Sequence, residues 1–319
     1  MKKGRCLLSI LLAGLLVVPV GLYAASRRAD DDIERVGPHG SIDWTENTIY
    51  ATGLGAIPNN ASNDAVAYLK ARDYAILDAM RNLLMAIHHV HIDAVTTGEE
   101  YMARDATIRA EVEGLLHHPR FISERRIREG RDAMVEVTMA APLYGNGSVA
   151  EAFRSALIPH GEGAAENGDR GTSGAEAVPA PSTTLPPVVS PPNIPPQVDE
   201  DSTPYTSVII DARGYRVQRD MSPKIYAADG TEVWGTVNVD PNFVIEHGIV
   251  VYAHSIAQAR QLPEAGSHPL ILRAIGGSNS PVHADVVLSQ ADAERLARLN
   301  ARDGFLDRFH VIFVVDPMD

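Results

Sequence analysis

The pattern of apolar and polar positions predicts helices and strands on both sides of one proline-rich segment. Between residues 64 and 89, apolar side chains recur three and four positions apart, as they do on one face of an amphipathic helix. They are Val66, Leu69, Ile76, Met80, Leu83 and Ile87. Charged residues occupy the other faces, and Ser62, Asn63 and Asp64 offer N-caps. The spacing therefore predicts a long helix that buries this apolar face.

The rest of the N-terminal segment alternates between strand and helix patterns. In the segment 132–142, Val135, Val137 and Met139 alternate with Glu136 and Thr138, which is typical of a half-buried strand. The other predicted elements are a strand Ile42–Gly55, a short strand Val90–Val95, a helix Glu99–Leu116 and a strand Arg120–Arg128. The resulting order, β-α-β-α-β-β, predicts an α+β domain over residues 42–157, with helices packed on one sheet.

A change of composition separates this domain from a second one. Residues 158–203 are rich in Gly, Ala and Glu and then in proline, with three Pro-Pro pairs between Pro179 and Pro196. Such a segment has too little apolar surface to offset its ordering entropy, and proline favours extended backbone. We therefore expect a flexible linker, on which the C-terminal domain searches a wide volume.

Residues 204–319 predict a second, mixed α/β domain. Asp229-Gly230 lies between two short strand patterns and predicts a hairpin. Asp240-Pro241 predicts the start of a short helix that ends near Gly248, and Ser289 caps a helix beginning at Gln290. Further strands are predicted at Tyr205–Asp211, Val250–Ala253, Leu270–Ile275 and His310–Val315, the last in the centre of its sheet.

The first residues predict export from a bacterial cytoplasm. Lys2, Lys3 and Arg5 precede an apolar run from Leu7 to Leu22, which is short for a membrane span and suits a cleavable secretory signal over residues 1–24. The alternative is an uncleaved anchor, the one feature through which the chain would contact a membrane. Either interpretation places the protein in the periplasm or at the cell surface.

Cysteine content and charge exclude several classes of function. The sole cysteine, Cys6, lies in the signal segment, so the chain after that segment has no disulfide, thiolate metal site or cysteine nucleophile. The formal net charge of −13 argues against broad binding to nucleic acid, because phosphates require a positive face.

Two stretches of the sequence resemble known families. A glycine-ended strand with Trp44, a long alanine-rich helix with Ala71-Arg72, the run Val112-Glu113-Gly114-Leu115 and the run Pro142-Leu143-Tyr144-Gly145 resemble the LPP-twenty lipoprotein family and the related N-terminal domain of flagellar assembly protein T. This resemblance covers Ile42–Gly145 and implies a cell-envelope protein without catalytic residues. The runs at 209–214 and 222–230 are similar to a C-terminal module found beside such domains in uncharacterised envelope proteins.

A cluster of histidines is a candidate metal site. His88, His89 and His91 form a cluster, and His117-His118 end the second predicted helix. Imidazole binds zinc or copper, but adjacent histidines on a helix point in different directions, and histidine near a helix C-terminus also interacts with the backbone dipole. A metal site at the cluster and a structural role both remain open.

Other candidate sites are polar. The arginines form a basic stretch that suits either an anionic partner or a solvated face; they are Arg120, Arg125, Arg126, Arg128 and Arg131, with Glu124 and Glu129 among them. Asp211 and Arg213 follow a buried strand, where either a ligand site or a turn-securing pair would fit. The Gly-rich turn at Gly276-Gly277-Ser278 lacks the lysine of a phosphate loop.

These observations predict a non-enzymatic exported protein that acts by protein–protein contact in assembling or stabilising a surface structure, with flagella as one candidate. We expect its partners to be other envelope or surface-structure proteins, and we expect no cofactor and no catalytic residue. The alternative is a periplasmic binding protein for a metal, held by His88, His89 and His91, or for a small anionic ligand.

Overall fold

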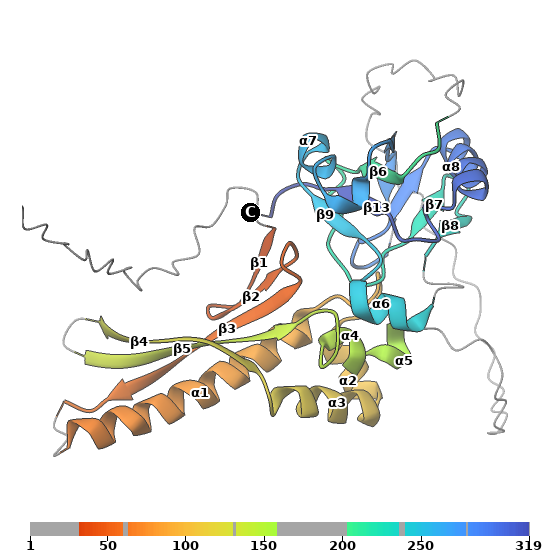
Figure 1. Ribbon diagram of the computed structural model, residues 1–319. Helices are drawn as coiled ribbons and strands as arrows, with labels where there is room; N and C mark the ends of the chain where they lie inside the picture. The colour runs from red at the N-terminus through yellow and green to blue at the C-terminus, as the bar shows by residue number, and fades with distance from the viewer. Residues whose placement is uncertain are drawn as a thin grey trace, which may run out of the picture. The chain divides into compact units, whose positions relative to one another are not determined.

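The computed structural model describes residues 32–59, 63–129, 132–157, 203–235, 240–278 and 280–318 (Figure 1). The predicted signal segment 1–24 and residues 158–202 of the predicted linker lie outside these ranges. Helices and strands alternate along both described halves, and the α+β fold class is confirmed.

The N-terminal half has an antiparallel five-stranded sheet in the order β1-β2-β3-β5-β4. Its strands are β1 (Ile33–Val36), β2 (Gly40–Asp43), β3 (Thr48–Ile57), β4 (Arg120–Glu129) and β5 (Asp132–Pro142). The single strand predicted at Ile42–Gly55 is wrong, because a tight turn divides it into β2 and β3. The carboxylate of Asp43 accepts hydrogen bonds from the backbone N–H of Thr45 and Glu46, and Asn47 adopts a positive φ of 51°.

Five helices are described in this half: α1 (Asp64–His89), α2 (Gly98–Arg104), α3 (Ala106–Leu116), α4 (Val149–Ala152) and α5 (Arg154–Leu157). The long helix α1 is confirmed, with Asn63 as its N-cap. The single helix predicted at Glu99–Leu116 is broken at Asp105, whose side chain accepts hydrogen bonds from the first turn of α3. The strand predicted at Val90–Val95 is wrong; only an isolated bridge between His91 and Thr97 forms there.

The described part of the C-terminal half contains two four-stranded sheets. The first is parallel, in the order β10-β6-β13-β9, and its strands are β6 (Ser207–Asp211), β9 (Val251–Ala253), β10 (Pro269–Arg273) and β13 (Val311–Val314). The second has the order β11-β12-β7-β8, with β7 (Ile225–Ala227), β8 (Glu232–Trp234), β11 (Gly276–Gly277) and β12 (Val286–Leu288). The helical segments are α6 (Pro241–His247), α7 (Ile256–Ala259), η1 (Pro263–Ala265) and α8 (Gln290–Asp303).

Most of the C-terminal predictions are confirmed. The hairpin at Asp229-Gly230 joins β7 to β8, and the apolar strand β13 lies inside its sheet. Asp240 and Ser289 cap α6 and α8 through their side chains. The predicted turn at Gly276-Gly277 is instead the short strand β11, paired with β12.

The two described halves contact each other. Residues from both form one buried apolar cluster, in which Trp44 meets Tyr252 edge to face at 5.9 Å. The backbone N–H of Gly145 donates to the carbonyl of Ile245 (2.7 Å). This contact contradicts the expectation that the C-terminal segment searches a wide volume on a tether. The predicted domain bounds, and whether each half folds alone, stay predictions.

A buried ion pair lies at this junction. Arg219 Nε donates to Asp32 Oδ2 (2.8 Å), and Nη2 lies 2.7 Å from Oδ1. The same Nη2 donates to the carbonyl of Asp316, and His254 Nε2 lies 3.5 Å from Asp32 Oδ1. The side chains of Arg219 and Asp32 are only 3% and 2% exposed. The start of the N-terminal half is thereby attached to the interior of the C-terminal half.

Candidate interaction surface

The helix α1 buries small side chains. Along its inner face, Ala67, Ala71, Ala75 and Ala79 lie against β3 and β5 (Figure 1). The approach is close because β3 carries glycine at two inward-facing positions. A methyl group on Gly53 would lie 2.2 Å from the carbonyl oxygen of Ala75, and one on Gly55 would lie 1.8 Å from that of Ala71. Only a strand without side chains at these positions accepts the helix so near.

Five large apolar side chains of the same helix face solvent instead. Leu69, Tyr74 and Leu77 are 57%, 67% and 62% exposed, and Val66 and Met85 are about half exposed. Lys70 and Asp73 lie between them and are also exposed. We call the six exposed residues 66, 69, 70, 73, 74 and 77 the outer face of α1. An exposed apolar patch on a well-packed scaffold marks a site of contact with another molecule.

The apolar face predicted for this helix is therefore partly wrong. Leu83 and Ile87 are buried as expected, and Ile76 and Met80 are half-buried. Val66 and Leu69, however, point away from the sheet. The overlooked signal is alanine at every fourth position of the helix, opposite two glycines in the strand that precedes it. That combination favours a close approach in which alanine is the buried residue.

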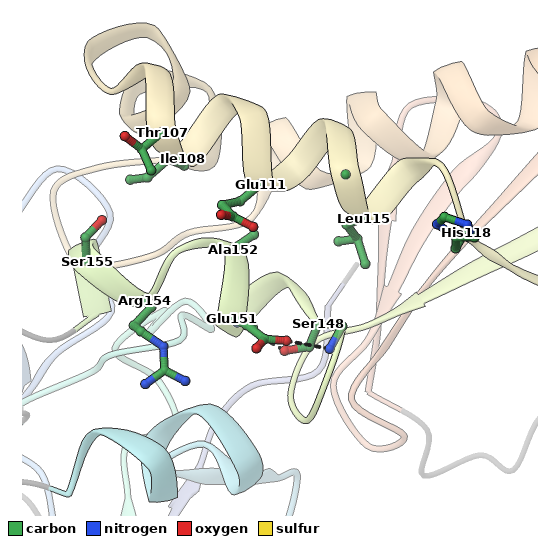
Figure 2. Close-up of a pocket in the computed structure, with 12 residues that line it drawn as sticks. Thr107, Ile108, Glu111, Leu115, His118, Ser148, Glu151, Ala152, Arg154 and Ser155 are labelled. Atoms are coloured by element: carbon green, nitrogen blue, oxygen red, sulfur yellow. Dashed lines mark hydrogen bonds between the residues drawn. The ribbon is translucent and has the colours of Figure 1, made fainter.

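A groove of about 830 Å³ lies between α3 and the short helices α4 and α5 (Figure 2). Ile108 and Leu115 of α3 and Ala152 of α4 give it an apolar floor. Glu111 points from α3 toward the short helices, whereas Arg154 points away from α3 (Figure 2). The other polar residues that line the groove are Thr107, His118, Ser148, Glu151 and Ser155. Apolar area bordered by polar side chains is typical of surfaces that bind proteins.

The predicted histidine cluster is not assembled as a set of ligands. His88 and His89 end α1, and His89 Nδ1 lies 2.8 Å from the carbonyl of Met85. His91 comes next in the loop, where burial and the nearby His89 lower the pKa of its imidazole. Among the described residues, no group of three or more His, Cys, Asp or Glu side chains is placed to hold a metal ion. Metal binding here stays a prediction.

The basic stretch is partly neutralised. Arg125 pairs with Glu136 (2.6 Å), and Arg126 lies 3.6 Å from Asp64. Glu124, which lies among these arginines in the sequence, pairs with Arg72 of α1 (2.7 Å). Arg131 lies outside the described residues. In the described chain, these pairs favour a solvated charged face over a free basic patch.

Asp211 and Arg213 do form a pair, and a third residue joins them. Arg213 donates two hydrogen bonds of 2.8 Å to Asp211, and Arg273, at the end of the neighbouring strand β10, donates a third of 2.6 Å. Burial alone would raise the pKa of Asp211, but the hydrogen bonds from both arginines hold it below its usual value. Both guanidinium groups stay about half exposed, and the carboxylate of Asp316 also acts on Arg213, so the charges of this cluster nearly balance.

A polar cavity of about 550 Å³ lies between the two halves, where Asp93 and Tyr101 face Lys224, Tyr226 and Asp285. Asp220 lies close by, and its Oδ1 accepts a hydrogen bond from the backbone N–H of Ser222 (2.6 Å). Within the described structure, Oδ2 of Asp220 is buried without a hydrogen-bond partner. Burial, together with the carboxylates of Asp285 and Asp93, raises the pKa of Asp220 well above its usual value.

We expect Asp220→Asn to raise the free energy of unfolding near neutral pH by about 1 kcal/mol or more, because it removes a buried carboxyl group whose ionised form burial disfavours. The pKa of Asp220 is raised in the folded state. Its favourable contribution is therefore complete below the unfolded pKa, near 3.8, and is lost as the pH rises through the folded pKa. Urea unfolding of the unmodified protein and of Asp220→Asn, from acidic to neutral pH, measures the difference between their free energies of unfolding. The advantage of the variant should grow with pH; a constant difference would contradict the assignment.

One comparison with known protein families covers the C-terminal half. A family model described as the second domain of Tp0624 from Treponema pallidum matches residues 207–317, which run from the start of β6 to just beyond β13. No curated protein matches the chain. Among the described helices, none is long and apolar enough to cross a membrane. The resemblance of residues 42–145 to the LPP-twenty and flagellar assembly protein T families stays a prediction. The C-terminal half is thus similar to one domain of a treponemal protein.

Proposed function

We propose that this is a non-enzymatic protein of the bacterial cell envelope, which acts by binding other proteins during the assembly or stabilisation of a surface structure. The observation that carries the proposal is the outer face of α1, where Leu69, Tyr74 and Leu77 are exposed while alanines fill the buried face. The predicted signal segment supports export. The resemblance to flagellar assembly protein T makes a flagellar structure one candidate.

The energetics favour a partner at this face. Covering a leucine-sized side chain stabilises a complex by roughly 1.5–3 kcal/mol relative to leaving it in water. Within the protein more than half of the surface of these side chains stays in water, because the sheet contacts the opposite face of the helix. The groove beside α3 offers a second surface of similar character. These two surfaces are suited to binding another protein.

A second candidate function is the binding of a small anionic ligand, and one observation favours it. Asp211, Arg213 and Arg273 gather at the carboxyl ends of β6 and β10, which are neighbours in a parallel sheet. Ligands of α/β sheets often bind at that edge. Arg213 and Arg273 are both about half exposed, so each still presents N–H donors for a carboxylate or phosphate group of a ligand.

Photo-crosslinking in living cells tests the contact function. A photoreactive amino acid replaces Tyr74 on the outer face, and in a matched control it replaces Ile275, an exposed apolar residue of the C-terminal half. We expect adducts with another polypeptide from position 74 at a yield at least about tenfold above the control, because interface energy concentrates on a few apolar anchors.

Equal yields from both positions would contradict the proposed contact surface. Native mass spectrometry of the purified protein then separates the two candidate functions. A bound small anion at one per chain, lost in Arg273→Ala, would favour the binding protein.

A further inference from the structure

Apolar and charged positions are arranged symmetrically along the outer face of α1. Its six residues stand at positions 66, 69, 70, 73, 74 and 77 and are symmetric about the midpoint between Ala71 and Arg72. Reversal exchanges Val66 with Leu77, Leu69 with Tyr74, and Lys70 with Asp73. Apolar positions exchange with apolar positions, and the basic position exchanges with the acidic one.

We propose that the partner on this face is a second copy of the same chain, with the two α1 helices antiparallel around a twofold axis. The proposal rests on the contact function proposed above and names the partner. A twofold contact uses the same patch on both copies, so the patch must complement itself. In this arrangement Val66 lies opposite Leu77 of the second copy, and Lys70 lies opposite Asp73 of the second copy. Symmetry repeats each pairing.

Charge complementarity supports this partner. Neither Lys70 nor Asp73 has an ion-pair partner within the described part of the chain, although their neighbours are engaged: Arg72 pairs with Glu124, and Asp78 with Arg81. Two opposite charges are therefore available at the positions that the twofold axis brings together. Leu69 and Tyr74 flank these pairs on either side of the contact.

The fold leaves room for such a contact. Antiparallel overlap about this midpoint spans residues 64–79 of each copy, about 24 Å of helix at 1.5 Å per residue. The overlap does not include the rest of α1, which ends at His89. It also does not include α2 and α3, which follow α1 in the chain. Each sheet packs on the inner face of its own α1, on the side away from the contact. The area is small for a stable dimer, so we expect a reversible, concentration-dependent association.

Sedimentation velocity over a wide range of concentration tests the proposal, with the full chain purified after export. We expect a monomer–dimer equilibrium. Lys70→Asp and Asp73→Lys each place like charges opposite one another, and each should weaken dimerisation at least about tenfold. The double variant Lys70→Asp/Asp73→Lys restores opposite charges and should recover the dimer. An equimolar mixture of the two single variants should form a heterodimer, because every cross-pair is then of opposite charge.

The outcomes separate the two proposals. Both exposed single variants should keep the circular dichroism spectrum and melting temperature of the unmodified protein, so a lost dimer reports on the contact. A chain that stays monomeric at all concentrations overturns the self-association, as does a dimer that ignores the charge exchanges or a double variant that fails to recover. If position 74 then crosslinks to a different envelope protein, the contact function survives. If it crosslinks to nothing, both proposals fail.

Discussion

Replacing Gly55 by alanine is expected to destabilise the protein by more than about 3 kcal/mol, beyond the range of ordinary overpacking in a core. The added methyl group would lie 1.8 Å from the carbonyl oxygen of Ala71, and this atom belongs to the backbone of α1 rather than to a flexible side chain. The helix would have to move away from β3, which would expose the alanines it buries there. Thermal unfolding followed by circular dichroism measures the loss.

Gly114→Ala is the matched control. Gly114 lies within α3, and no atom outside its own helix lies within 4 Å of the position that a methyl group would take. Alanine is favoured over glycine inside a helix by about 1 kcal/mol, so this variant should be neutral or slightly more stable. A Gly55→Ala protein that melts together with Gly114→Ala would contradict the close approach of α1 to the sheet.

Replacing Arg219 by methionine should cost about 3–5 kcal/mol, the usual effect of removing one partner from a buried ion pair. Asp32 would then remain 2% exposed without the guanidinium group that balances its charge. The carbonyl of Asp316 would also lose its hydrogen-bond donor. Chemical denaturation gives the change in the free energy of unfolding.

A double-mutant cycle isolates the pair. Asp32→Leu together with Arg219→Met replaces both charges with apolar groups and should be markedly more stable than Arg219→Met alone, because no unpaired charge is left. Arg298→Met, at an exposed position of α8, controls for loss of an arginine and should change stability by less than about 0.5 kcal/mol. Additive effects of the two junction changes would show that Asp32 and Arg219 do not interact.

Elements whose ends are marked by a capping residue or a turn dipeptide could be predicted from the sequence. Ser289 and Asp240 cap α8 and α6 as expected, and Asp229-Gly230 forms its hairpin, because these signals act within a few residues. The break at Asp105 escaped prediction, although aspartate is a good N-cap, because the apolar spacing continues across it. A weak apolar run such as residues 90–95 has no neighbouring strand with which to pair, and the sequence does not show this.

The candidate surface was harder to predict, since it depends on what lies on the other side of α1. Periodicity identifies the apolar positions of a helix but not which of them face the sheet. Here Gly53 and Gly55, in the preceding strand, decide that alanine is buried and leucine exposed. The Arg273 hydrogen bond to Asp211 joins residues 62 positions apart, and only the parallel pairing of β10 with β6 brings them together. Both features depend on tertiary contacts, which the sequence pattern of a single element does not show.

The junction ion pair also has a consequence for folding during synthesis, because its two residues leave the ribosome at different times. Asp32 and Arg219 are separated by 187 positions. At about 5–20 residues per second, a ribosome needs roughly 10–40 s to synthesise the chain between them. Throughout that time the Asp32 carboxylate and the apolar surface around Trp44 have no partner from the C-terminal half. The apolar surface around Trp44 therefore stays uncovered for many seconds, until the C-terminal half has been synthesised and can pack on it.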